Sequence, residues 1–202
     1  MQFLEVDLLT LSMETLRDEL LTRANFSDEE VSGIISKFKT VSLDKKESFL
    51  SAGKVSDSIA YVEKGSLIYS QTSPEGDDIA IDFAFEGDFV TYLNSFLSDT
   101  ASDIDITTNE PSILKTLSKT ELYDLYQKYP KMERTGRLLL EEGLAKIAKG
   151  RTIFQTMDNQ DRYLFLMKHS PHILQRIPQY HVATYLGIKP ESLSRIRRNL
   201  ST

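Results

Sequence analysis

The sequence predicts an α+β protein in which a jelly-roll or sandwich of short strands lies between helical segments. Residues 40–117 contain short apolar runs about eight to twelve residues apart, separated by turns that contain Gly. Before and after this region, apolar side chains recur every three or four positions, which is the period of a helix. The two textures together predict a β-rich centre with helices on either side.

The strand region contains several alternating segments. We predict strands at residues 48–50, 59–62, 66–69, 79–85, 102–108 and 113–117. Ile79, Ile81, Phe83 and Phe85 alternate with smaller or polar residues, so we expect that strand to have one buried and one open face. Turns are expected at residues 51–54 and 73–77, where Gly, Pro and Ser gather.

Two helix starts are marked by capping residues. Ser27 and Glu30 have the spacing of a capping box, which predicts a helix from there to Phe38 within a helical segment that covers residues 1–39. Asp158 is the expected N-cap of a helix that ends near Lys168. A short helix is expected from residue 122 to 129.

A long helix at residues 129–156 carries an apolar seam of heptad spacing. Its apolar positions are Leu140, Leu144, Ile147 and Phe154. Such a seam packs either on its own domain or on a second copy of the chain. We expect the second copy, because proteins that read a palindromic DNA site generally do so as two-fold dimers. The sequence therefore divides into a sensing domain (1–128), a dimerisation helix (129–156) and a C-terminal domain (157–202).

The C-terminal residues 177–200 have the pattern of a helix-turn-helix. Gly187 supplies the positive φ that often ends a helix, and Pro190 suits the first turn of the next one. Leu193, Ile196 and Leu200 form a stripe of helical period that we expect to be buried. The stripe leaves polar and basic side chains on the outer face, which is typical of a helix that enters the DNA major groove but also of any helical hairpin with a solvated basic face.

Charge is distributed unevenly along the chain. Residues 146–202 contain ten Lys and Arg and three acids, so 14 of the 24 basic residues and 27 of the 30 acidic residues precede them. An acidic N-terminal part and a basic C-terminal part are expected when only the C-terminal part of the protein contacts a polyanion.

Composition excludes several kinds of chemistry. The chain has no Cys, which rules out disulfides, thiolate metal sites and cysteine nucleophiles. Its three histidines, His169, His172 and His181, lie outside the strand region, so a metal-dependent jelly-roll enzyme is not expected. The N-terminus has acids where a signal peptide needs Lys or Arg, and no run reaches the ~18 apolar residues of a membrane span. We expect a cytoplasmic protein that is not an enzyme and does not bind membranes or metal.

Three segments resemble the catabolite-activator (Crp/Fnr) family of bacterial transcription regulators. They are Ala60-Tyr61-Val62-Glu63-Lys64-Gly65, Glu86-Gly87-Asp88-Phe89 and Gly187-Ile188-Lys189-Pro190-Glu191-Ser192-Leu193-Ser194-Arg195-Ile196. The order of strand domain, long helix and helix-turn-helix is also similar, over nearly the whole chain. The resemblance implies a cyclic-nucleotide-binding-like β-domain and a homodimer that binds a palindromic operator, with RNA polymerase as a further partner.

The resemblance also implies which residues contact DNA. Glu191 and Arg195 match the family's base-reading Glu and Arg, and Arg195 can bond a guanine while Glu191 accepts from a cytosine. Phosphate or backbone contacts are expected from the remaining positions, which are Gln179, Tyr180, His181, Lys189, Pro190, Ser192 and Arg198.

The chain departs from the family pattern at two places. Gly87 and Asp88 match the Gly-Glu of the cyclic-nucleotide pocket, but the Arg that would neutralise the phosphate falls near Ser102, between acids. A buried phosphate without a partner charge is unfavourable, so we expect no cAMP and either another effector or none. The sequence also ends where many members continue into a wing, which predicts modest DNA affinity. The alternative function is a degenerate sensor or scaffold that keeps the fold without binding an operator.

Overall fold

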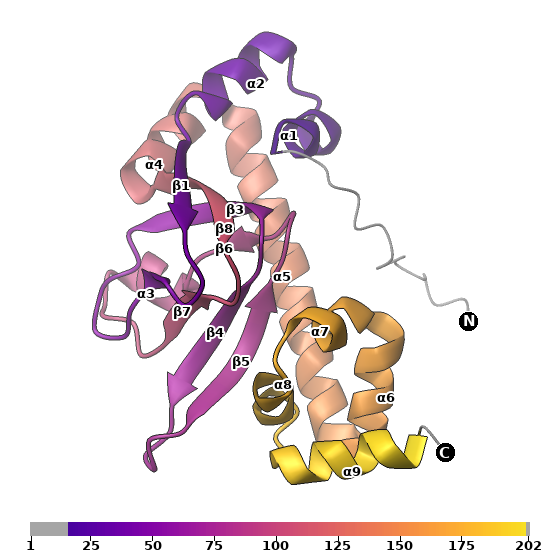
Figure 1. Ribbon diagram of the computed structural model, residues 1–202. Helices are drawn as coiled ribbons and strands as arrows, with labels where there is room; N and C mark the ends of the chain where they lie inside the picture. Colours follow the sequence, from indigo (N-terminus) through magenta and orange to yellow (C-terminus); the bar gives the residue numbers. More distant parts are fainter. Residues whose placement is uncertain (1–15, 201–202) are drawn as a thin grey trace, which may run out of the picture.

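The computed structural model describes residues 16–200, apart from the side chains of Arg23, Ala24 and Phe154. Leu11 and Met13, which the sequence places in the first helical segment, lie outside this range. A β-domain forms the centre of the molecule, the long helix α5 runs along it, and a group of short helices lies at its lower end (Figure 1). This arrangement confirms the mixed architecture of a β-rich centre between helices.

The β-domain consists of two four-stranded antiparallel sheets with strand orders β1-β8-β3-β6 and β2-β7-β4-β5. This order is that of a jelly roll, in which two Greek keys place the strands alternately in one sheet and the other. The strands are β1 Lys39–Leu43, β2 Ser48–Leu50, β3 Ser58–Lys64, β4 Leu67–Thr72, β5 Asp78–Ala84, β6 Phe89–Val90, β7 Asp105–Thr108 and β8 Ser112–Ser118.

The expected alternation along residues 79–85 is wrong. Ile79 and Ile81 are exposed at 37% and 42%, whereas Ala80 is buried, as are the three consecutive residues 83–85. The cause is a bulge: Tyr69 of β4 pairs with Asp82 of β5, but Ser70 pairs with Ala80, so Ile81 is an extra residue in β5. An extra residue reverses the side-chain alternation beyond it.

Helices cover the β-domain at one end and continue beyond it at the other. Their bounds are α1 Leu16–Ala24, α2 Asp28–Ile35, α3 Leu93–Ser98, α4 Lys119–Lys128, α5 Pro130–Thr156, α6 Asn159–His169, α7 Pro171–Arg176, α8 Gln179–Tyr185 and α9 Pro190–Leu200. Helices α3 and α7 were not among the elements expected from the sequence. Both predicted N-caps are confirmed. Ser27 Oγ accepts from the Glu30 N–H at 3.2 Å, and the Asp158 carboxylate accepts from the Asp161 N–H at 2.9 Å.

Three hydrophobic clusters hold these elements together. One lies between the two sheets, and a second joins α1, α2, α4 and the start of α5 to the β-domain. The third joins β4 and β5 to α6, α7, α8 and α9, which we call the C-terminal helices. These helices are therefore docked on the β-domain, although they follow it at the far end of the chain.

Candidate nucleic-acid interface and neighbouring cleft

Helices α8 and α9 are joined by a tight turn at Gly187. Its φ of +71° is confirmed as a left-handed conformation, which Gly adopts without steric cost. The Gly187 N–H donates to Thr184 O and the Ile188 N–H donates to Ala183 O, both at 3.0 Å, so the turn closes the end of α8. Leu193 is 1% exposed and anchors α9 against α8, but Leu200 is 39% exposed, so the expectation that it is buried is wrong. It lies in the last turn of α9, beyond the elements that cover Leu193.

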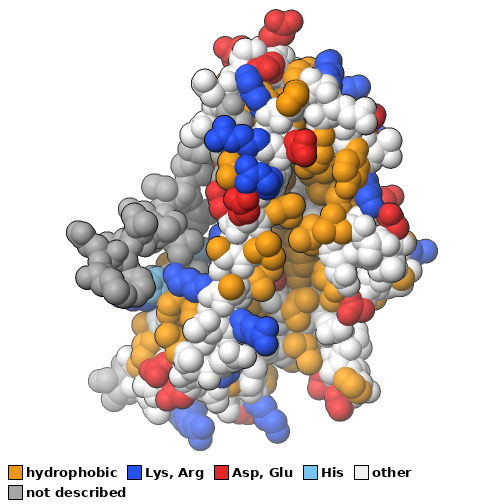
Figure 2. All heavy atoms as spheres, turned by 180° about the vertical axis from the view of Figure 1, so that it is seen from behind, with side chains coloured by type: hydrophobic (Ala, Val, Ile, Leu, Met, Phe, Trp, Pro, Cys, Tyr) orange, Lys and Arg blue, Asp and Glu red, His pale blue; other side chains and the backbone are white. Residues whose placement is uncertain are grey.

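The outer face of α9 presents a carboxylate and a guanidinium. Glu191 and Arg195 are both exposed and lie four positions apart, hence on one side of the helix. Among the residues that the structure describes, neither side chain has a hydrogen bond or an ion pair. Ser192 on α9 is partly buried. The other positions named from sequence in this region are exposed, and they are Lys189, which precedes α9, and Pro190 and Arg198 on it. Lys and Arg side chains project from the lower edge of the molecule, where α9 lies (Figure 2).

The three predicted contacts at the start of α8 differ in exposure. Gln179 and Tyr180 are exposed, whereas His181 is partly buried. Its Nδ1 is buried without a hydrogen-bond partner in the described residues. Burial lowers the pKa of His181, although the nearby Asp78 carboxylate opposes this shift. Burial thus disfavours the charged form of His181 in this arrangement.

The solvent exposure of the side chains of helix α5 increases along its length. Met132 and Thr135 in its first two turns are buried, but from residue 140 to 152 no side chain is. Leu140, Leu144 and Ile147 are exposed at 43%, 59% and 66%. Phe154, the fourth predicted seam residue, has a side chain outside the described part of the structure. Hydrophobic side chains gather over the middle of the face seen in Figure 2.

A cleft of about 720 Å³ is lined by residues of the β-domain, of α5 and of α6, α7 and α8. Gly87 and Asp88, two of the predicted effector-pocket residues, line it, while Ser102 is not among its lining residues. Ser102 is 4% exposed, and its hydroxyl donates to Ile104 O at 2.8 Å. The structure therefore brings two of the three predicted pocket residues together.

The β-domain wall of the cleft is acidic. Asp82, Glu86 and Asp88 contribute carboxylates from this wall. The cations of the cleft come from the facing helices and are Lys146, Lys149 and Arg151 of α5 and Arg162 of α6. Although Asp82 is exposed to solvent, partial desolvation in the cleft raises its pKa to about 6, and a bond from the Phe83 N–H opposes this shift. Burial also raises the pKa of Asp88, against a 2.9 Å bond from the Phe85 N–H. The carboxylates thus face the cleft from the β-domain and the cations face it from the helices.

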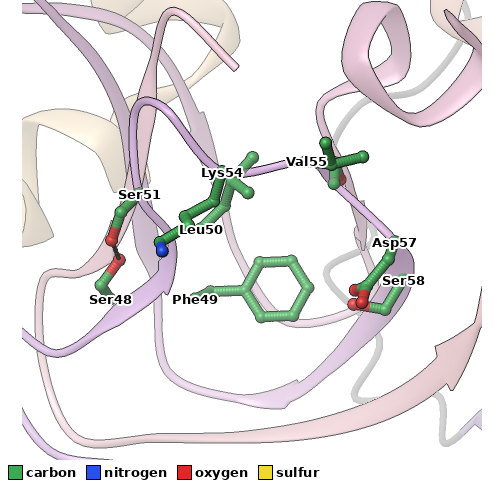
Figure 3. A pocket seen from close by; sticks show the side chains of 9 residues that line it. Ser48, Phe49, Leu50, Ser51, Lys54, Val55, Asp57 and Ser58 are labelled. Atoms are coloured by element: carbon green, nitrogen blue, oxygen red, sulfur yellow. Dashed lines mark hydrogen bonds between the residues drawn. The ribbon is translucent and has the colours of Figure 1, made fainter. Parts of the chain in front are cut away.

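A smaller cavity of about 190 Å³ lies beside the β2–β3 turn (Figure 3). Ser48, Lys54 and Asp57 are among its lining residues, and Ser48 Oγ is 2.9 Å from Ser51 Oγ. In the described part of the chain, no group of three or more His, Asp or Glu side chains is placed to hold a metal ion. Neither cavity therefore contains a metal-ligand cluster.

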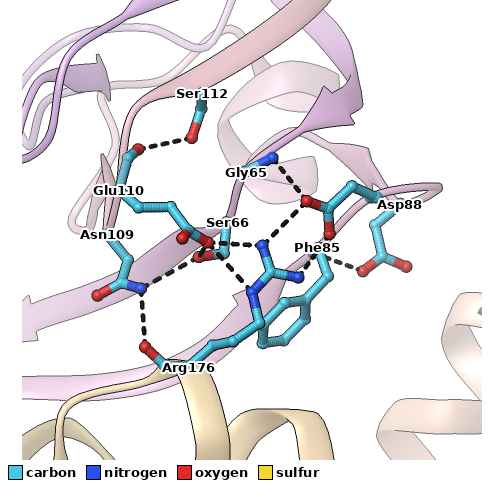
Figure 4. A network of polar contacts seen from close by, with 9 residues as sticks. Gly65, Ser66, Phe85, Asp88, Asn109, Glu110, Ser112 and Arg176 are labelled. Atoms are coloured by element: carbon cyan, nitrogen blue, oxygen red, sulfur yellow. Dashed lines mark hydrogen bonds and ion pairs between the residues drawn. The ribbon is translucent and has the colours of Figure 1, made fainter. Parts of the chain in front are cut away.

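A polar network that was not expected from the sequence surrounds Arg176, the last residue of α7. Its Nη1 donates to Glu86 Oε2 at 2.6 Å, and its Nη2 donates to Glu110 Oε1 at 2.6 Å and to Glu86 Oε1 at 2.9 Å (Figure 4). The Arg176 carbonyl accepts from Asn109 Nδ2 at 3.1 Å. We call Arg176, Glu86 and Glu110 the clasp. No local sequence pattern predicts the clasp, because its two carboxylates lie 90 and 66 positions from Arg176.

The clasp is charged in the folded protein. The hydrogen bonds that Arg176 donates to Glu86 are the main reason that the pKa of Arg176 is raised above its usual value. Burial opposes the ionisation of Glu86, but the bonds from Arg176 and from the Gly65 N–H outweigh burial and lower its pKa. The pKa of Glu110 is lowered in the same way, by Ser66 and Arg176 against burial. A bidentate, partly buried pair of this kind is stronger than a surface salt bridge.

Comparison with known proteins defines the class of this fold. Residues 40–129 match the family model of the cyclic nucleotide-binding domain. No curated protein matches the chain in sequence. Within the described residues, none of the helices has the length and apolar character needed to cross a membrane.

Solved structures resemble the chain over most of its length. FixK2 from Bradyrhizobium japonicum is 13% identical, with 81% of this chain and 84% of that chain covered and a TM-score of 0.70. The c-di-GMP-responsive global regulator CLP of Xanthomonas campestris is 15% identical, with 87% and 92% covered and a TM-score of 0.68. The catabolite activator protein of Thermus thermophilus is 18% identical, with 90% and 86% covered and a TM-score of 0.54. The chain therefore has the fold of Crp/Fnr-family regulators.

Proposed function

We propose that this protein is a sequence-specific DNA-binding transcription regulator. The observation that carries the proposal is the outer face of α9, where Glu191 and Arg195 are exposed, one turn apart and without partners among the described residues. A Glu and an Arg in this arrangement have the donors and acceptors that recognise a G·C base pair in the major groove. The fold shared with regulators supports this reading of α9, and it supports a regulator over an enzyme.

The proposed regulator acts as a homodimer. Leu140, Leu144 and Ile147 expose a row of apolar side chains on a helix whose first turns are well packed. Burial of such a row against the same row of a second copy removes it from water and places two α9 helices about a two-fold axis. Two helices so placed match the half-sites of a palindromic operator in double-stranded DNA, where RNA polymerase is the further partner.

We further propose that the effector is not cAMP. The carboxylates of Asp82, Glu86 and Asp88 line the β-domain side of the cleft, and Ser102 offers no cation. A cyclic phosphate bound at Gly87 and Asp88 would lie against these carboxylates, which costs free energy, because the cations that line the cleft belong to α5 and α6 on its other side. An effector of different chemistry, or none, fits these walls better.

The test starts by identifying bound sites through genome-wide footprinting with the purified protein. Arg195→Ala should then weaken binding to the preferred site by about 1–3 kcal/mol and relax the preference at one base pair. Arg197→Ala is the matched control, because it removes the same charge two positions further along α9, on a different side of the helix. Equal affinities of Arg195→Ala and wild type for the preferred site would remove Arg195 from base reading.

The alternative function is a scaffold that keeps the fold but binds only other proteins. It predicts that no duplex is bound even at low ionic strength, where phosphate contacts are strongest. A binding titration at two salt concentrations distinguishes the two functions. The regulator shows an affinity that falls as salt rises, and the scaffold shows no binding at either concentration.

A further inference from the structure

Opposite charges face each other across the cleft between the β-domain and α5 without closing it. Lys146 of α5 lies close enough to Asp82 and Asp88 for its charge to act on both carboxylates. Among the described side chains, however, no ion pair joins Lys146 to either of them. Charges that attract each other but stay apart leave room for a molecule that contacts both walls.

The acidic wall has unused hydrogen-bond acceptors. Asp82 Oδ1 accepts from the Phe83 N–H at 2.8 Å. Asp88 Oδ2 accepts from the Phe85 N–H at 2.9 Å (Figure 4). In the part of the chain that the structure describes, the second oxygen of each carboxylate has no hydrogen bond. Both carboxylates can therefore accept hydrogen bonds from a cationic group in the cleft.

The α5 wall has unused hydrogen-bond donors. Lys146, Lys149 and Arg151 extend from neighbouring turns of α5, and all three are exposed. Within the described residues, none of them forms a hydrogen bond or an ion pair. Arg162 of α6 differs, because two backbone carbonyls hold its guanidinium. The three α5 cations can therefore bind an anionic group.

Apolar side chains complete the lining of the cleft. Ile81, the extra residue of β5, is 42% exposed, and Ile147 of α5 is 66% exposed. Phe165 of α6 and Tyr185 of α8 also line the cleft and are partly buried. Covering apolar surface removes it from water, which is favourable in proportion to the area covered. A ligand with an apolar body would gain this contribution.

Gly150 opens the α5 wall of the cleft. Gly in the interior of a helix is less favourable than Ala. Apart from the adjacent backbone of α5, no atom of the described structure lies within 4 Å of the position that a Cβ at Gly150 would take. No described neighbour therefore requires a Gly here. A residue without a side chain does, however, let a ligand approach the helix backbone closely.

We propose that this cleft binds a small zwitterion, which is a molecule with a cationic group at one end, an anionic group at the other and an apolar body between them. Its cationic end binds Asp82 and Asp88, and its anionic end binds Lys146, Lys149 and Arg151. The cleft volume of about 720 Å³ lies within the range of about 300–1,000 Å³ that is typical of small-ligand sites. A ligand with charge of one sign would be attracted by one wall and repelled by the other.

The first test compares three linear probes of equal length. Aminooctanoate carries an ammonium and a carboxylate at opposite ends, whereas octylamine and octanoate each keep only one of these charges. In calorimetric titrations of the full chain, aminooctanoate should bind about tenfold more tightly than either of the others, because it makes one more charge-assisted contact. Equal affinities of aminooctanoate and either single-charge probe, or no saturable binding of aminooctanoate, would overturn the inference.

The second test removes the charge of the acidic wall. Asp82→Asn/Asp88→Asn keeps an acceptor for each backbone N–H, so aminooctanoate should bind about tenfold more weakly while octanoate binds at least as tightly as before. Glu75→Gln/Asp77→Asn, in the exposed β4–β5 turn, is the matched control with the same change in charge. If the two Asp substitutions weakened octanoate as much as aminooctanoate, the acidic wall would not be the partner of the ammonium.

Lys146→Gln/Lys149→Gln is the reciprocal variant. It should weaken the binding of aminooctanoate about tenfold and leave octylamine at least as tightly bound, since only the anionic end loses its partners. Lys45→Gln/Lys64→Gln is its control, because it removes the same charge from exposed positions that do not line the cleft. Equal losses for aminooctanoate and octylamine would show that the α5 cations do not bind the carboxylate.

Gly150→Leu fills the cleft without changing its charge. Leu is a better helix former than Gly, so the variant should melt at a temperature no lower than that of wild type while it loses the binding of aminooctanoate. Gly143→Leu is the matched control: it lies seven positions earlier on the same side of α5, its Cβ position is also open, and it is not among the lining residues. Unchanged affinity in Gly150→Leu, or equal losses in both variants, would place the ligand elsewhere.

Zwitterion binding does not depend on the proposed function, because none of these measurements involves DNA. A cleft that binds no zwitterion would leave base recognition by α9 unaffected. A protein that bound aminooctanoate as described but bound no duplex at low salt would retain the ligand site and lose the proposed function.

Discussion

The β-domain and the C-terminal helices achieve their stability in different ways. The β-domain encloses a cluster between its own sheets, which includes Val62, Ile106 and Leu114, all 0% exposed. The C-terminal helices complete their cluster with Ile68, Ala80, Phe83 and Phe85 from the β-domain. A small group of short helices buries little surface alone, so these helices depend on their neighbour for part of their core. A region built in this way can change position only by giving up part of its own stability.

The largest effects are expected from two matched core substitutions. Leu114 in the β-domain and Leu193 in α9 are exposed at 0% and 1%. Each Leu→Ala change should cost about 2–5 kcal/mol of unfolding free energy, from lost burial and the cavity left behind. Hydrogen exchange should rise across the β-domain in Leu114→Ala, but mainly in α6–α9 and at the edge of β5 in Leu193→Ala. The same exchange pattern in both variants would contradict the distinction between the two regions.

Intermediate effects are expected from the helix caps of the two regions. Ser118 caps α4 in a capping box with Glu121, and Asp158 caps α6. Replacement of either by Ala should lower the unfolding free energy by about 1 kcal/mol, because an N–H at the helix start loses its acceptor. Denaturant titrations measure the loss. Only Asp158→Ala should also speed exchange at Ala80, since α6 belongs to the docked helices.

The smallest effect is expected at Asp82, in the cleft between the regions. Burial raises its pKa from 3.8 to about 6, so ionisation is less favourable in the folded than in the unfolded protein. Stability from this group is therefore lost as pH rises from about 4 to about 6 and is constant above that window. Asp82→Asn should remove this loss and raise the melting temperature at pH 7, but only slightly, because Asp82 is exposed and solvent screens its charge.

Thermal melts at pH 4 and pH 7 measure the difference between Asp82→Asn and wild type. Asp77→Asn in the exposed β4–β5 turn is the control for the change in charge. An equal stabilisation by Asp82→Asn at both pH values would assign the effect to something other than ionisation in the cleft.

Local signals explain which parts of the fold could be predicted from the sequence. The capping box at Ser27, the cap at Asp158 and the positive φ of Gly187 depend on residues within a few positions of one another. The bulge at Ile81 could not be predicted in this way, because it exists only through the register between β4 and β5. The capping box at Ser118 has the same local pattern as the one at Ser27, so this signal was present in the sequence and was missed.

The site shows the same division between local and distant determinants. The exposure of Glu191 and Arg195 follows from the helical period of α9, and their roles as DNA contacts stay predictions. The clasp depends on three residues in three separate segments, and nothing near Arg176 in sequence marks it as the partner of Glu86. The docking of α8 on β5 is equally distant, since Ala80 and Thr184 are 104 positions apart.

The bond between Ala80 and Thr184 has a consequence for solubility. With α8 in place, the hydroxyl of Thr184 accepts a hydrogen bond from the backbone N–H of Ala80 in β5. Strand β5 is an edge strand, and it also exposes Ile79 and Ile81. An edge strand with free N–H and C=O groups and apolar side chains is a template for pairing with other chains. Variants that release α8 are therefore expected to aggregate as concentration rises, and a Lys at position 79 or 81 would act as a gatekeeper that keeps them in solution.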